Sequence, residues 1–195
     1  MRQPTMRTQH RFATWGCTSD EAAAPMSGDD LVPGARLQTT RAVTIAAEPA
    51  AVWPWLVQMG PGRAGAYTFD WVENLFGLNM HSSREIMPAF QHLAVGDELT
   101  LGASGPTMRA HVVEPCHTLG WASDAGDWTW TFQLTPVSGG TRLISRNRLL
   151  GPDSPLLRRL YAAVMVPGSL LMERKMLRGI AQRAERSRRV TEDPR

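Results

Sequence analysis

The residues best suited to chemistry lie close together in the sequence, between Arg63 and His81. An arginine, two carboxylates and a histidine can donate hydrogen bonds, hold an oxyanion or transfer a proton. We therefore take Glu73 and His81 as candidate acid–base groups, and Arg63 as a candidate donor to a carbonyl or carboxylate of a ligand. The structural alternative is that Arg63 ties a glycine-rich loop to Asp70 or Glu73 on a short helix.

Other catalytic and cofactor motifs are weak or absent. The segment 60–65, GPGRAG, has the glycine spacing of a dinucleotide-binding loop, but the residues before it follow a helical period rather than that of a parallel strand. We interpret these glycines as a tight link between helices. The histidines lack metal-ligand spacing, and Cys17 and Cys116 form no C-x-x-C pair, so we expect neither a metal nor a cofactor.

Composition limits the class of protein. A chain of 195 residues with 43% hydrophobic content can bury one sizeable core. It contains no apolar run of about 18 residues, so no transmembrane segment is expected. The absence of a secretory leader and the two isolated thiols favour the cytoplasm.

The formal charge of +3 is unevenly distributed, because basic residues crowd the segment 174–189. This cluster is either the solvated face of a helix or a surface that attracts phosphate, anionic lipid or an acidic partner. Nucleic acid is not expected as a partner, since the tryptophans follow buried periods instead of interleaving with the basic residues.

Hydrophobic periodicity predicts the elements that position these groups. After a strand and two short helices comes a run of antiparallel strands, and one long helix with a kink at Pro167-Gly168 closes the chain. In the segment 127–135, aromatic side chains alternate with polar ones, which predicts a sheet covered on one side only. The strands are expected at 37–47, 97–103, 107–114, 117–123, 127–135 and 140–150, and the helices from residue 48, over 67–76, and from 155 to about 188.

The two ends of the chain are polar and lack the hydrophobic periodicity of its middle. We expect residues 1–13 and 189–195 to be disordered. Residues 14–36 are expected to form an arm that packs on the main domain, 37–188, and that contains a short helix capped by Thr18 or Ser19.

Three segments resemble a known superfamily: WPWLVQMGPGRAGAYTFDWVENLFG, IMPAFQHLAVGDEL and MERKMLRGIAQRAE. They are similar to an actinobacterial-type branch of the SRPBCC superfamily, which includes START-like and polyketide cyclase/dehydrase-like proteins. The resemblance implies an α+β helix-grip fold, with a curved antiparallel sheet of six to seven strands around a long C-terminal helix and two short helices after the first strand. The seventh strand would lie within Met80–Met87.

The resemblance also implies a deep cavity between the sheet and the terminal helix. The residue types agree with an apolar site, because hydrophobic side chains and flexible methionines can contact a hydrophobic ligand. Each such residue could equally be a plain core residue. The expected ligand-binding residues are Trp55, Tyr67, Trp71, Trp128, Trp130, Phe132, Tyr161, Met165, Met172 and Met176.

Three functions remain open at this point. The first is a carrier or sensor that binds a hydrophobic small molecule such as a lipid, a polyketide or an aromatic compound. The second is an enzyme of the polyketide cyclase/dehydratase type that acts on a ligand in the same cavity. The third is a partner-binding module that uses the arm and the basic helix, and a homodimer is one such assembly.

Overall fold

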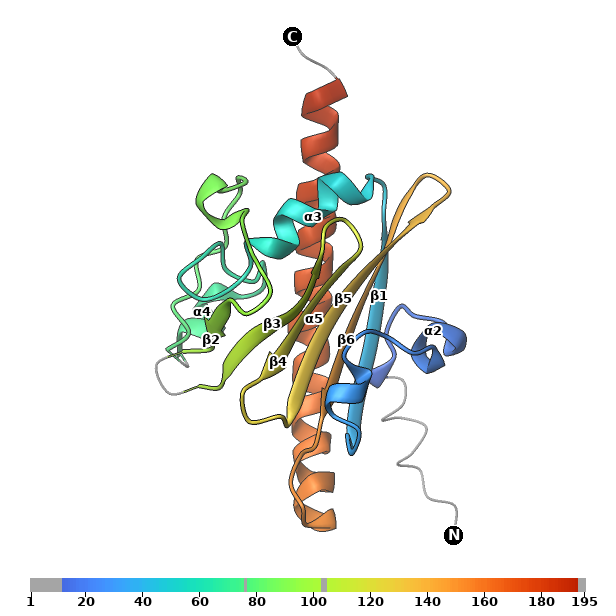
Figure 1. Ribbon diagram of the computed structural model, residues 1–195, viewed down its shortest axis with the longest axis vertical. Helices are drawn as coiled ribbons and strands as arrows, with labels where there is room; N and C mark the ends of the chain where they lie inside the picture. The colour runs from blue at the N-terminus through green and yellow to red at the C-terminus, as the bar shows by residue number, and fades with distance from the viewer. Residues whose placement is uncertain (1–11, 76, 103–104, 193–195) are drawn as a thin grey trace.

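The computed structural model describes residues 12–75, 77–102 and 105–192. Its strands are β1 (Leu37–Ile45), β2 (Glu98–Thr100), β3 (Thr107–Glu114), β4 (Thr118–Ser123), β5 (Trp128–Val137) and β6 (Gly140–Leu149), and its helices are α2 (Ser19–Ala23), α3 (Pro49–Val57), α4 (Asp70–Leu75) and α5 (Pro155–Glu192). The strands form one antiparallel sheet in the order β1-β6-β5-β4-β3-β2. The sheet curves around α5, as Figure 1 shows.

This arrangement confirms the predicted α+β fold with six strands. The seventh strand expected within Met80–Met87 is not present, because side chains of α4 take the place of a neighbouring strand. The Asn74 side chain bonds the backbone of Met80, and the Asp70 carboxylate accepts from the backbone N–H of Ser82. These backbone groups already have hydrogen-bond partners, so they do not require a neighbouring strand.

Helix α5 is continuous through Pro167 and ends four residues later than the sequence predicts, although residues 193–195 lie outside the described part of the chain. In Figure 1 it runs along one face of the sheet and extends past the strands at both ends. Within the described residues, no helix combines the length and the apolar character needed to cross a membrane.

Both faces of strand β5 are covered, which corrects the expectation of a sheet with one solvated face. Phe132 and Leu134 face α5 and are buried, as the alternation predicts. Thr129 and Thr131 on the opposite face are buried as well, and the Thr131 hydroxyl donates to the carbonyl of Ser27 (3.0 Å). The segment before β1 therefore covers the outer face of the sheet.

Arginines of β6 hold this segment in place. Arg146 is buried and donates to the carbonyls of Glu21, Ala22 and Ala24 at 2.7–3.0 Å, while also pairing with Asp29 at 2.8 Å. The helix that these carbonyls belong to, α2, is the predicted one, and Thr18 caps it. Arg146 thus has a structural role on the outer face of the sheet. The boundaries 14–36 and 37–188 remain a prediction.

Replacing Arg146 with alanine should therefore loosen the segment before β1. We expect a loss of about 3 kcal/mol of unfolding free energy, because three carbonyls and one carboxylate lose their donor in a buried site. Urea unfolding measures this loss, and limited proteolysis reports cleavage before residue 36. The less buried Arg148 is the matched control, and an equal loss for its alanine variant would contradict this role.

The half of α5 that follows residue 175 contributes buried side chains to the core on the inner face of the sheet. Met176, Leu177 and Ile180 belong to one core cluster with Phe132 and Leu134, and these five residues are at most 2% exposed. A core of this kind leaves no room for a guest, since protein interiors are close-packed. The deep cavity expected between the sheet and the terminal helix therefore does not open at Phe132, Met176 or Ile180, which are core residues.

A buried ion pair joins α5 to the sheet on the N-terminal side of Met176. Arg41 of β1 pairs with Glu173, and both side chains are almost completely buried. Glu173 also accepts hydrogen bonds from Ser145 and Asn147 on β6, and Arg41 donates to the Ser169 hydroxyl (2.9 Å). The polar groups around this ion pair are therefore largely matched inside the fold, which the burial of two charges requires.

Candidate functional site

The interior is hollow at another place, beside α4. A partly enclosed cavity of about 170 Å³ lies between this helix, the loop after α3 and the inner face of strands β2, β4 and β5. We call it the α4 pocket. Its lining residues are Met59, Gly60, Pro61, Ala66, Glu73, Leu78, Met80, Leu99, Leu101, Trp121 and Trp130.

Glu73 is the only charged residue among these lining residues. Its side chain is 8% exposed, and its Oε2 atom has no hydrogen-bond partner. Burial raises the pKa of the Glu73 carboxyl. The hydroxyl of Thr68 opposes this rise, and the nearby negative charge of Asp70 adds to it. The pocket therefore presents one carboxyl group with a raised pKa in apolar surroundings.

Helix α4 holds Glu73 in this position because its other polar residues are occupied. Asp70 accepts two hydrogen bonds from Ser82, one from the backbone N–H (2.7 Å) and one from the hydroxyl (2.5 Å). Asn74 accepts from the N–H of Met80 (2.6 Å) and donates to its carbonyl (2.9 Å). These two residues fix the segment 80–82 against the helix and leave Glu73 between them, facing the pocket.

The glycine-rich loop brings the opposite wall close. Gly60 and Gly65 pair through their backbones across a tight turn, as expected for a link between helices. Gly65 has a φ of +68°, and a Cβ atom there would lie 2.7 Å from the backbone nitrogen of Ser82. This close approach allows the loop and the segment 80–82 to meet beside the pocket.

Two predicted residues line the pocket or adjoin it. Trp130 is a lining residue, and Trp128 stacks beside it with ring centroids 6.4 Å apart. Their indole N–H groups donate to Ser145 (3.0 Å) and Asn147 (2.9 Å), the residues that also bond Glu173. The two rings are thereby fixed in orientation.

Four other predicted residues belong to the solid core: Trp55, Tyr67, Phe132 and Met176 are all at most 2% exposed and lie outside the lining of the pocket. The Tyr67 hydroxyl donates to the carbonyl of Trp55 (2.9 Å). Burial raises the pKa of Tyr67 to about 12, so this hydroxyl stays protonated and serves as an internal tie.

Trp71 and Met165, two of the expected ligand-binding residues, are 69% and 47% exposed and do not line the α4 pocket. Trp71 lies between Asp70, which bonds Ser82, and Glu73, which faces the pocket. The helical turn of about 100° per residue directs it outward. Tyr161 and Met172 are half-buried on α5 and are not among the residues that line the α4 pocket.

Of the three candidate catalytic residues, Glu73, His81 and Arg63, only Glu73 lines the pocket. His81 is exposed. Arg63 donates to the carbonyls of Val57 (3.0 Å) and Phe90 (3.2 Å), which makes it a structural tie, although with partners other than the acidic residues expected. No cluster of three or more metal-ligating side chains occurs among the described residues.

Sequence reasoning missed most of the pocket wall. Trp121 and Leu99 line it from the strands, and Leu101, Met59 and Met80 line it from the loops. Trp121 carried a usable signal, because it lies two residues after the buried Leu119 and therefore on the same face of β4. Its partner on β5 is Trp130. The loop residues carried none.

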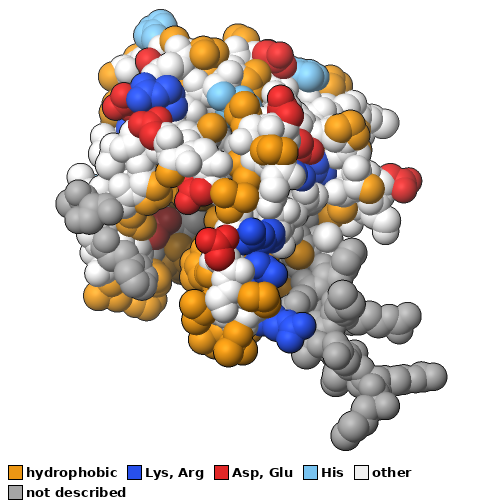
Figure 2. Space-filling view, turned by 60° about the horizontal axis from the view of Figure 1, so that its bottom comes forward, with side chains coloured by type: hydrophobic (Ala, Val, Ile, Leu, Met, Phe, Trp, Pro, Cys, Tyr) orange, Lys and Arg blue, Asp and Glu red, His pale blue; other side chains and the backbone are white. Residues whose placement is uncertain are grey.

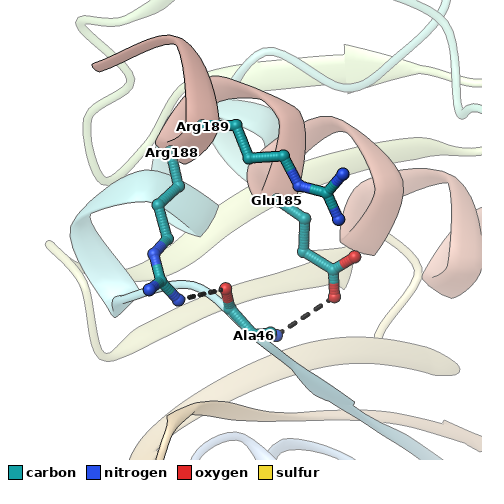
Figure 3. A pocket seen from close by; sticks show the side chains of 4 residues that line it. All are labelled: Ala46, Glu185, Arg188 and Arg189. Carbon is teal, nitrogen blue, oxygen red and sulfur yellow. Dashed lines mark hydrogen bonds between the residues drawn. The ribbon is translucent and has the colours of Figure 1, made fainter. Parts of the chain in front are cut away.

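A second hollow, of about 220 Å³, lies on the surface at the other end of the sheet and is polar. Figure 3 shows how its residues meet: Glu185 accepts from the backbone N–H of Ala46 (3.1 Å), and Arg188 donates to the carbonyl of the same residue (3.0 Å). Both side chains are engaged in tying α5 to the turn after β1. This hollow is therefore a junction between elements.

No protein-family model and no curated protein sequence matches the chain. Solved structures resemble it at low identity. A protein of Rhodobacter sphaeroides is 22% identical, with 77% of this chain and 93% of that one covered and a TM-score of 0.49. A Polyketide_cyc-like protein of Corynebacterium glutamicum is 16% identical over 80% of this chain and 93% of that one, with a TM-score of 0.38. An Aha1 dimer of Colwellia psychrerythraea is 15% identical over 72% of this chain and 97% of its own, with a TM-score of 0.38.

Similarity at this level of sequence identity describes the fold and does not identify a ligand. The fold itself is defined by its element order: one strand, two short helices, five further antiparallel strands and a closing helix that the sheet grips. The chain therefore has the helix-grip fold.

Proposed function

We propose that the protein binds a small, largely apolar molecule in the α4 pocket and holds its one polar group with Glu73. The volume of about 170 Å³ supports a guest of about one substituted ring, since a dry protein cavity of about 150 Å³ binds benzene and drug-sized ligands need about 300 Å³ or more. The apolar side chains, with two indoles among them, supply the contact surface.

The observation that carries this proposal is the unpartnered Oε2 atom of Glu73. A buried polar atom without a partner costs free energy, and most such atoms in folded proteins are satisfied. A hydroxyl or carbonyl of a ligand would satisfy it in the bound state. The function that follows is that of a carrier or sensor whose ligand is selected by size and by one hydrogen bond.

A matched pair of probes tests the proposal: p-cresol and toluene, which differ by one hydroxyl group. Fluorescence of Trp121 and Trp130 should report the binding of both, and p-cresol should bind more tightly. Changing Glu73 to leucine should weaken p-cresol by about tenfold, as the loss of one buried hydrogen bond implies, and leave toluene unchanged. Glu85→Gln, on an exposed neighbouring loop, is the control. Equal binding of p-cresol by the wild type and the leucine variant would refute the role of Glu73.

The raised pKa of Glu73 also favours a second function, proton transfer to or from a bound ligand. Cyclisation or dehydration of a polyketide-like compound is the reaction class that the resemblance implies, and the pocket volume favours a single ring over a long chain. Under this alternative, Glu73→Gln would keep the binding of p-cresol and abolish turnover. Unchanged turnover would remove Glu73 from the chemistry.

The same residue predicts how stability changes with pH. A raised pKa means that the folded state holds its proton at a pH where the unfolded chain has already released it. The stabilisation by Glu73 is therefore present below its ordinary pKa of about 4.3 and is lost as the pH rises through the raised value. Thermal unfolding between acidic and neutral pH should show the wild type losing stability relative to Glu73→Gln. If the stability of the two proteins changed with pH in the same way, the raised pKa of Glu73 would be contradicted.

A further inference from the structure

The outward face of the first half of α5 is apolar and uncovered. Leu156, Leu160, Val164 and Leu171 are 74%, 63%, 64% and 60% exposed. Their spacing places them on one stripe of the helix, about 22 Å long at 1.5 Å per residue. Isolated exposed leucines are ordinary, whereas a continuous apolar stripe of this length marks an interaction surface.

The same stripe becomes basic where the apolar residues end. Arg174 follows Leu156 by about five helical turns and Arg178 follows Leu160 by the same interval, so they continue the stripe. Both are exposed and lie over the ring of Trp15, and Lys175 beside them is also exposed. We call the whole surface, apolar half and basic half together, the α5 face.

The α5 face contains no exposed carboxylate that could offset these charges. Between residues 155 and 184 the sequence has a single acidic residue, Glu173, which is buried against Arg41. Arg159, near the start of the stripe, adds another exposed positive charge. The face therefore combines apolar side chains with uncompensated positive charge.

The position of this face suits contact with a broad surface. In Figure 1 the first turns of α5 project past the strands. Figure 2, seen from that end, shows hydrophobic side chains gathered on the projecting part, with lysine or arginine side chains and an acidic side chain next to them. A flat partner can reach such a projection without meeting the sheet.

We propose that the α5 face docks on a lipid bilayer that carries anionic headgroups. The leucine and valine side chains enter the interface between headgroups and acyl chains, and the basic residues bind the headgroups. A second copy of the chain carries the same positive charge on this face, and a parallel arrangement of two copies would place arginines beside arginines. This surface is separate from the α4 pocket, so the inference does not rest on the proposed ligand.

Vesicle sedimentation with the full chain tests the docking. The protein should sediment with phosphatidylcholine vesicles that contain phosphatidylglycerol, and the bound fraction should fall with added salt and be small for phosphatidylcholine alone. The double variant Leu160→Ser with Val164→Ser should bind at least about tenfold more weakly. The matched control is Leu75→Ser with Val95→Ser, which changes two equally exposed apolar residues elsewhere.

Thermal unfolding in the absence of lipid checks that both double variants fold. Equal binding to neutral and anionic vesicles would overturn the role of charge, and equal binding by the two double variants would overturn the α5 face as the docking surface. Sedimentation velocity without lipid addresses the second copy: a dimer that only Leu160→Ser with Val164→Ser dissociates, without vesicle binding by the wild type, would overturn the proposal.

Discussion

Changing Glu173 to alanine is expected to lower the unfolding free energy by about 3–5 kcal/mol, the usual cost of breaking a buried ion pair from one side. The change leaves the guanidinium group of Arg41 fully buried with no counter-charge. It also removes the acceptor of Ser145 and Asn147, the residues that orient the two stacked tryptophans. Urea unfolding followed by tryptophan fluorescence measures the loss.

The double variant Arg41→Met with Glu173→Leu is the control for this prediction. It replaces both charges with apolar groups of similar size, which is often close to neutral for a buried pair. We expect it to recover more than half of the stability lost in Glu173→Ala. A double variant as unstable as the single one would show that packing, and not the unpaired charge, accounts for the loss.

Changing Gly65 to alanine should destabilise the fold and disable the α4 pocket together. The left-handed backbone costs about 1–2 kcal/mol for a residue with a Cβ atom. The Cβ would also approach backbone atoms of His81 and Ser82 to 2.7–2.9 Å, which forces that segment away. We expect about 2 kcal/mol of further loss from this overpacking. Since Ser82 anchors Asp70 on α4, Glu73 should shift and p-cresol affinity should fall by at least about tenfold.

Gly62 offers a matched control in the same loop. Its φ of +67° is nearly identical, but a Cβ atom there meets nothing within 4 Å. Gly62→Ala should therefore cost only the backbone strain, about 1–2 kcal/mol, and leave p-cresol binding intact. If the two alanine variants lost the same stability and the same affinity, the close contact with Ser82 would have no part in shaping the pocket.

The strands and the long helix could be predicted from the sequence because their signals are local. The alternation through β5, the cap at Thr18 and the stripe that ends at Met176 and Ile180 each appear within one segment. Such patterns report which face of an element is buried. They do not report what covers the other face, so the burial of Thr131 beneath the preceding segment could not be foreseen.

The pocket could be predicted only in part, because its walls come from segments far apart in the chain. Glu73 and Trp130 stood out by residue type, whereas Met59 and Leu101 look like any other apolar residues. Whether an aromatic side chain fills the core, as Phe132 does, or borders a hollow depends on how closely the neighbouring layers approach. That separation is a tertiary property, which no single periodic segment encodes.

The division of the interior into a solid part and a hollow part has a consequence for the design of variants. The solid part, built by α5 with β5 and β6, secures folding, and the hollow part draws no wall from α5. Substitutions at half-buried positions such as Leu78 and Leu101 can alter the shape of an accepted guest while sparing the tightly packed layer. Under the proposed function, the selectivity of the α4 pocket can thus be varied by design at little cost to the stability of the packed core.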